Sequence, residues 1–164
     1  MNPITRTDVR PGDVVLLGVP WDTQSSFLRG AAEAPTQIRE ALASPSSNWC
    51  AEDGRDLEDE PRFVDGGDLA IATAPADADD LLGASAPAAD VIVGIEAAVG
   101  AWLARGASIV ALGGDHAVSL PLVRAHARHH AGLGVLHVDA HPDLYDTFEG
   151  DPFSHACPFA RTAR

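Results

Sequence analysis

Short apolar runs alternate with longer stretches of helical composition along this chain. Residues 14–19, 108–112 and 134–138 are apolar runs of strand length. Residues 91–104 place apolar side chains at helical spacing, and residues 118–130 have helical composition with a proline only near their start, where it is tolerated. This order of elements predicts an α/β fold with a mainly parallel sheet.

The strongest local prediction covers residues 108–138, where strand, helix and strand follow one another. Such a βαβ unit has two parallel strands and a right-handed crossover, so the carboxyl ends of both strands lie at one edge of the sheet. Open α/β sheets bind ligands at that edge. Residues 70–89, rich in Ala, Asp and Pro, are expected to form a long connection with little core of its own.

Side chains of the types that bind metal ions follow the ends of both strands of this unit. His116 ends the run Gly-Gly-Asp-His after the first strand, and Asp139, His141 and Asp143 alternate directly after the second. Alternate residues of an extended chain lie about 6.6–6.8 Å apart on one side. That spacing is wide for a single ion and suits a pair of ions about 3.5–4 Å apart that share a carboxylate. The pattern predicts half of a two-metal hydrolase site.

Each of these side chains also has a purely structural interpretation. His116 could start a helix, and the aspartates could form a solvated acidic turn, although an Asp at the end of an apolar strand is costly to bury without a partner. His137 has the same strand parity as Asp139, and we expect it to be a half-buried core histidine. The two clusters on one βαβ unit favour the metal interpretation.

Composition narrows the class of protein. The 164 residues, 46% of them hydrophobic, suffice for one domain with a sizeable core, so we expect a single domain over residues 1–164. The net charge of −13 argues against nucleic acid and anionic membranes as partners and is compatible with a cationic substrate, although solubility alone explains it. The two cysteines form no disulfide framework, and no signal-type or membrane-spanning stretch occurs, so we expect a cytoplasmic location.

Three motifs, in this order, carry a family resemblance. Gly-Gly-Asp-His at residues 113–116, Asp-Ala-His-Pro-Asp at residues 139–143, and Ser-His with a following Pro-Phe within residues 154–159 resemble the ureohydrolases: arginase, agmatinase and their relatives. Residues 17–22 and 65–69 resemble the agmatinase-type members. The resemblance implies a three-layer α/β/α fold of the arginase type, and hydrolysis of a small cationic guanidino compound to urea and an amine.

The resemblance also implies roles for individual residues around two manganese ions. His116 and Asp143 would bind the first ion, His141 would bind the second, and Asp139 would bridge both. His155 would transfer a proton at the reacting centre, although this chain has Ala156 where the family usually has Gly.

The resemblance covers the N-terminal half of the family's pattern. Complete members carry a second Asp-x-Asp motif that completes both metal shells, and a later acidic residue that receives the guanidinium group, and nothing after residue 159 supplies them. We therefore expect a truncated fold without turnover of its own, and a homo-oligomer for the complete enzyme. Agmatine, arginine, guanidinobutyrate, guanidine and formiminoglutamate all stay open as substrates.

Two alternatives belong to other functional classes. The chain could be a non-catalytic remnant, or a subunit that another chain completes. Alternatively, Cys157 could be the nucleophile of a guanidino-modifying enzyme, paired with His155 two residues away. That scheme leaves both metal-type clusters unexplained.

Overall fold

The computed structural model describes residues 4–5, 9–71 and 87–162, so most of the predicted connection at residues 70–89 lies outside the described part. Within that part, the strands are β1 (Ile4–Thr5), β2 (Val14–Val19), β3 (Phe63–Asp68) and β4 (Ser108–Gly113). The helices are α1 (Ala34–Leu42), α2 (Ala88–Leu103), α3 (Ser119–His129) and α4 (Pro158–Thr162), with short 3-10 helices at Ala31–Glu33, Leu57–Asp59 and His116–Val118.

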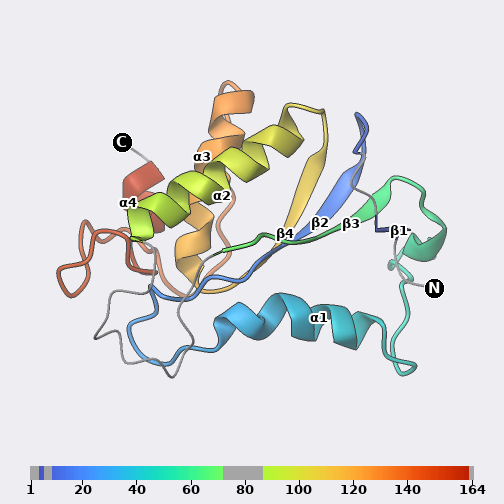
Figure 1. Ribbon diagram of the computed structural model, residues 1–164, viewed down its shortest axis with the longest axis horizontal. Coiled ribbons are helices and arrows are strands. Elements are labelled where there is room, and N and C mark those ends of the chain that lie inside the picture. The colour runs from blue at the N-terminus through green and yellow to red at the C-terminus, as the bar shows by residue number, and fades with distance from the viewer. Residues whose placement is uncertain (1–3, 6–8, 72–86, 163–164) are drawn as a thin grey trace.

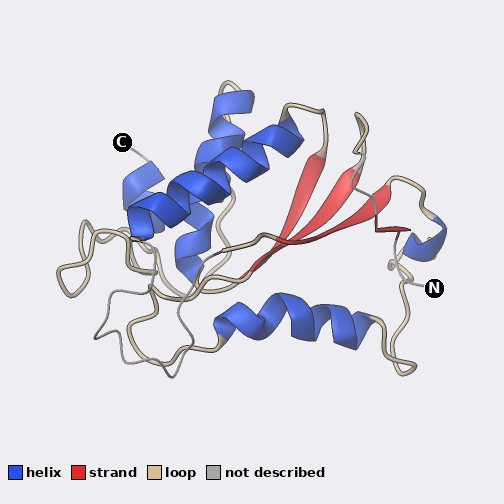
Figure 2. Cartoon of the chain, in the orientation of Figure 1, coloured by secondary structure: helices blue, strands red, loops and turns tan. Residues whose placement is uncertain are grey.

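The sheet is parallel throughout, with the strand order β1-β3-β2-β4 among the described residues. Helix α1 lies on one of its faces, and α2 and α3 lie on the other (Figures 1 and 2). The strands run toward the end of the molecule where the C-terminal segment, orange to red, lies (Figure 1). The fold is therefore the three-layer α/β/α arrangement predicted from the sequence.

The main core lies between the sheet and the α2–α3 pair. Val19 of the central strand β2 is fully buried, and the predicted helical stripe of α2 presents Ile92, Ile95 and Val99 to this core. Burying one such side chain contributes about 1.5–3 kcal/mol relative to leaving it in water. The scaffold therefore has an apolar core of its own.

Strand β3 is an element that the pattern of apolar residues does not predict. Its sequence Phe-Val-Asp-Gly-Gly-Asp contains residue types that are depleted in strands. Arg39 of α1 fixes this end of the sheet, because it pairs with Asp65 at 3.0 Å and with Asp68, and donates to the carbonyl oxygen of Gly67 at 3.0 Å. Charged contacts to α1 thus stabilise a strand that has few apolar side chains.

The prediction of a strand at residues 134–138 is wrong, and the second strand of the predicted βαβ unit is therefore absent from the described residues. The segment has no regular secondary structure, and β4 is left as the edge strand. A groove of about 460 Å³ lies between the segment, β4 and α3. A strand in a parallel sheet is stable only when both its faces are covered, and among the described residues this segment has cover on one side only.

None of the helices in the described part of the chain combines the length and the apolar character that crossing a membrane requires.

Candidate metal centre

The Gly-Gly-Asp-His run forms a tight crossing between the end of β4 and the loop after β2. The backbone N–H of Asp115 donates to the carbonyl oxygen of Trp21 at 2.9 Å. A Cβ atom at Gly114 would lie 2.0 Å from that same oxygen, so only glycine fits there. The crossing places His116 at the start of a 3-10 helix, at the carboxyl edge of the sheet.

Asp115 locks this crossing and is not directed at the cluster of metal-type ligands. Its buried carboxylate accepts hydrogen bonds from the backbone N–H groups of Ala117 (2.9 Å) and Gln24 (3.0 Å) and from the hydroxyl of Ser25 (3.2 Å). Burial raises the pKa of this carboxyl, against the opposing effect of those hydrogen bonds. Asp115 therefore acts as the side-chain cap that positions the residue after it.

His116 meets both aspartates that the sequence predicted as its neighbours. Its Nδ1 lies 2.7 Å from Oδ2 of Asp143 and 3.6 Å from Oδ2 of Asp139. Asp143 is buried and has a φ of 47°, a left-handed conformation that is uncommon outside glycine and is often found at functional sites. Topology thus brings together residues that lie far apart in the sequence.

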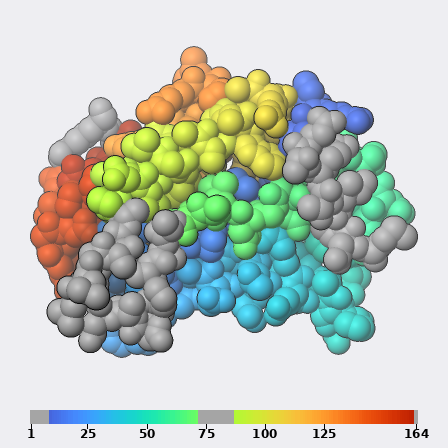
Figure 3. Space-filling model, in the orientation of Figure 1, coloured from blue at the N-terminus to red at the C-terminus, as the bar shows by residue number. Residues whose placement is uncertain are grey.

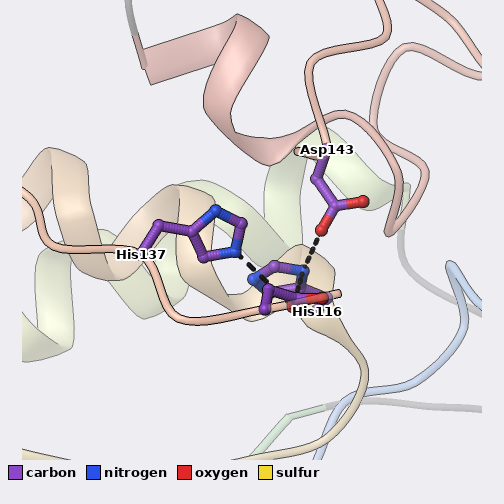
Figure 4. A group of neighbouring side chains, drawn as sticks. His116, His137 and Asp143 are labelled. Carbon is purple, nitrogen blue, oxygen red and sulfur yellow. Dashed lines mark ion pairs between the residues drawn. The ribbon is translucent and has the colours of Figure 1, made fainter. Parts of the chain in front are cut away.

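His137 forms a cluster with His116, Asp139 and Asp143. The sequence did not predict that His137 belongs to it. Its Nε2 lies 3.5 Å from Oδ2 of Asp139, and one ligand atom from each of His116, His137, Asp139 and Asp143 lies within 4.8 Å of the other three. Figure 4 shows His137 and Asp143 approaching His116 from different sides. The strand parity shared by His137 and Asp139 was the signal in the sequence that could have found it.

Helix α4 contributes Phe159, which packs against the cluster. The ring of Phe159 lies 4.2 Å from the ring of His137 and 5.6 Å from that of His116, centroid to centroid. The backbone N–H of Phe159 donates to the carbonyl oxygen of Asp143 at 3.2 Å. The C-terminal residues, red in Figure 3, form this end of the molecule beside α2.

His141 lies outside the cluster. Its side chain is 79% exposed, and its Nδ1 is 3.8 Å from Oδ1 of Asp139. Its backbone N–H donates to that oxygen at 3.0 Å and holds the pKa of Asp139 below its usual value. The predicted role of His141 as a ligand of a second ion stays a prediction.

His155 lines the same cleft as the predicted ligands. This cleft has a volume of about 640 Å³, and its walls include His116, Asp139, His141 and Asp143. Nδ1 of His155 lies 3.0 Å from the carbonyl oxygen of Gln24. Because a carbonyl oxygen only accepts hydrogen bonds, Nδ1 carries the ring proton, and Nε2 is left to exchange protons.

Cys157 has a different setting. Its buried thiol faces the carbonyl oxygen of Asp151 at 3.7 Å, and burial raises its pKa. A raised pKa disfavours the thiolate that a cysteine nucleophile needs. The geometry counts against the alternative in which Cys157 and His155 form a catalytic pair.

The four clustered side chains fit a divalent metal ion. Imidazole nitrogen and carboxylate oxygen are ligands of zinc and related ions, and bond lengths of about 2.0–2.2 Å place the ligand atoms of a tetrahedral site about 3.3–3.6 Å apart. The separations of 3.6 Å (His116 to Asp139) and 3.5 Å (His137 to Asp139) are close to this value. The 2.7 Å separation between His116 and Asp143 is that of a hydrogen bond and would widen around an ion.

A family model and curated relatives match most of this chain. The family model named Arginase family matches residues 12–164. The chain is 40% identical over 150 residues to arginase 1, mitochondrial, from Arabidopsis thaliana, covering 89% of this chain and 41% of that protein. It is 35% identical over 152 residues to an agmatinase of Neisseria meningitidis serogroup C, covering 90% of this chain and 44% of the relative. The chain thus spans less than half the length of these relatives.

Two solved structures agree with these sequence matches. The arginase from Medicago truncatula matches with a TM-score of 0.79 and 38% identity, covering 92% of this chain and 46% of that one. The proclavaminate amidino hydrolase from Streptomyces clavuligerus matches with a TM-score of 0.77 and 28% identity, covering 98% of this chain and 50% of that one. The motifs, the fold and the family match over nearly the whole sequence agree, and the chain belongs to the arginase family.

Proposed function

We propose that this chain supplies the metal-binding and proton-transferring part of a manganese-dependent ureohydrolase centre, which hydrolyses a guanidino compound to urea and an amine. The observation that carries the proposal is the convergence of His116, Asp139 and Asp143 in one cleft with His155. Relatives named arginase and agmatinase support this reaction class.

The predicted ligands divide between two ions. His116 and Asp143 would hold the first, His141 the second, and Asp139 would be shared. Manganese bound in this way supplies Lewis-acid chemistry, because it brings the pKa of water toward neutrality and stabilises the negative charge that develops during attack on a carbon centre. The carboxylates of the cleft also favour a cationic guanidinium group.

His155 is the proposed proton-transfer residue. Its Nδ1 is occupied by the carbonyl oxygen of Gln24, so its Nε2 is the atom that gives a proton to the leaving amine. The hydrogen bond to Gln24 fixes the orientation of the ring. General acid–base catalysis of this kind contributes about 10²–10⁴-fold to a rate.

We propose that the chain alone does not turn over. With Asp139 shared, the second ion would have only Asp139 and His141 as ligands, fewer than the three protein ligands usual in catalytic sites. The test is urea release from agmatine and from arginine with added manganese. The lone chain should release none, and release should appear when the chain is co-expressed with the part of the Medicago truncatula arginase that it does not match.

Variants of the complemented complex sharpen this test. Asp139→Ala should abolish urea release, whereas His155→Ala should lower it by about 10²–10⁴-fold. His130→Ala replaces an exposed histidine of the α3 end and is the matched control, with unchanged activity. Urea release by the lone chain, or a complemented complex that binds manganese and releases no urea from either substrate, would contradict the proposal.

A further inference from the structure

Residues 135–138 invert the usual rule for apolar and polar side chains. Leu136 and Val138 are 90% and 88% exposed, and Val135 is also exposed. His137 is turned inward, with 26% of its side chain exposed. Apolar burial alone would orient the segment the other way, and the inward side chain of His137 packs on Phe159 and faces Asp139 instead.

The inward nitrogen of His137 makes no hydrogen bond of normal geometry, and its acidic contact is Asp139. Its Nε2 is buried from solvent, and the nearest acidic atom is Oδ2 of Asp139 at 3.5 Å, an ion-pair distance. Buried polar atoms in folded proteins are almost always satisfied by protein, water or an ion. The ring lies 4.2 Å from that of Phe159 and 5.4 Å from that of His116, so the nitrogen faces the cluster.

The composition of the cluster separates it from the ligand set that the motif implies. It contains all three predicted ligands of the first ion, His116, Asp139 and Asp143, together with His137. The predicted ligand of the second ion, His141, is 79% exposed and lies outside it. The cluster therefore offers four protein ligands to one ion.

The geometry points to His137 as the fourth ligand of a single-ion site that this chain forms with His116, Asp139 and Asp143. The inference rests on the proposed function, because it concerns the same centre, and adds a ligand that the motif does not assign. Two imidazole nitrogens and two carboxylates form a set that suits Zn²⁺ and Co²⁺, which bind such ligands more tightly than Mn²⁺ does. This chain alone should therefore bind one ion, in the order Zn²⁺ > Co²⁺ > Mn²⁺.

The test is metal titration of the whole chain, followed by calorimetry for Zn²⁺ and Mn²⁺ and by visible absorption for Co²⁺. His137→Phe keeps a ring against Phe159 and removes the nitrogen, and His137→Ala is the second variant. His130→Ala is the matched control, because it removes one exposed histidine, and His141→Ala tests the ligand that the motif assigns to the second ion. Circular dichroism of each variant checks that the fold is retained.

Loss of His137 should weaken Zn²⁺ binding by on the order of 100-fold or more, since even residues that only orient a ligand cost about 10–100-fold. Mn²⁺ binding should weaken less, and the Co²⁺ spectrum should change. His141→Ala and His130→Ala should each cost less than about 10-fold, below the effect of an orienting residue.

Three results would overturn the inference: no ion bound by the wild-type chain, wild-type affinity and spectrum in both His137 variants, or a loss confined to His141→Ala. The proposed function fails separately. A complemented complex without urea release, combined with metal binding that depends on His137, would remove the proposed activity and support the ligand role of His137.

Discussion

Two regions of this chain are held in different ways. One is the scaffold, which consists of the sheet and helices α1, α2 and α3, and the other is the segment at residues 131–143, which carries most of the candidate ligands. In the scaffold, Val15 and Val19 of β2 are fully buried, whereas Leu136 and Val138 of the segment at residues 131–143 are 90% and 88% exposed. Polar contacts around Asp139 and the ring of Phe159 hold the segment instead. The candidate centre lies at the border between the two, so its geometry depends on the part with the weaker apolar support.

The largest difference in stability between scaffold and segment variants should appear when an apolar side chain is truncated in each region. Ile95→Ala leaves a cavity in the main core and should lower the free energy of unfolding by about 2–5 kcal/mol. Leu136→Ala removes an exposed side chain and should change it by less than about 0.5 kcal/mol. Urea denaturation of both variants measures the difference. A loss of more than about 1 kcal/mol in Leu136→Ala would mean that the segment is part of the cooperative core.

A smaller difference in stability is expected when a glycine is replaced by alanine in each region. Gly114→Ala forces a methyl group against the carbonyl oxygen of Trp21 and should cost about 1–3 kcal/mol of stability, besides displacing His116. Gly134→Ala meets no atom within 4 Å and should stay within about 0.5 kcal/mol of the wild type. The same denaturation assay, with Zn²⁺ titration of Gly114→Ala, checks both effects. Equal stability of the two variants would show that the crossing at Gly114 relaxes freely.

The smallest difference concerns how much stability the fold loses at low pH. In the scaffold, burial acts to raise the pKa of Asp22, but hydrogen bonds from the N–H groups of Gly30 and Ala32 and the side chain of Arg29 outweigh it and lower the pKa. In the segment, the pKa of Asp139 is also lowered. A carboxyl with a lowered folded-state pKa stabilises the fold above its unfolded pKa, and that stabilisation is lost as the pH falls through the folded pKa.

Asp22→Asn should therefore flatten the loss of global stability below about pH 4, where unfolded aspartates begin to take up protons. Asp139→Asn should leave this loss of stability at low pH (the acid limb) unchanged, because the segment opens without unfolding the scaffold. Denaturation in the presence of a chelator, from neutral to acidic pH, measures both. An acid limb that flattens in Asp139→Asn and persists in Asp22→Asn would reverse the comparison.

Much of the fold and of the candidate site follows from sequence patterns. The apolar run of β2, the helical stripe of α2 and the early proline of α3 each predict an element that the structure contains. The structure also brings His116 close to Asp139 and Asp143, although without the second strand that the sequence predicted. These features depend on local patterns and on the crossing at Gly114, which a short sequence can encode.

The remaining features depend on contacts between distant parts. Strand β3 has few apolar side chains and is stabilised by Arg39 from α1, a charge pairing that periodicity does not reveal. The segment at residues 134–138 has the apolar composition of a strand, but burial of a strand requires cover that is not local in the sequence. The sequence favours a core histidine at His137, because shared parity with Asp139 places both side chains on one side of an extended chain and does not show that the ring reaches the ligand cluster.

Amide hydrogen exchange tests the central claim most directly, namely that the scaffold folds by itself while the segment at residues 134–138 depends on a completing part. In the lone chain without metal, β2 amides should be protected close to the global free energy of unfolding, and amides 134–138, which lie outside regular secondary structure, should exchange much faster. In the complex with the completing part of the Medicago truncatula arginase, the segment should gain protection comparable to that of β2. Protection of residues 134–138 equal to that of β2 in the lone chain would contradict the account.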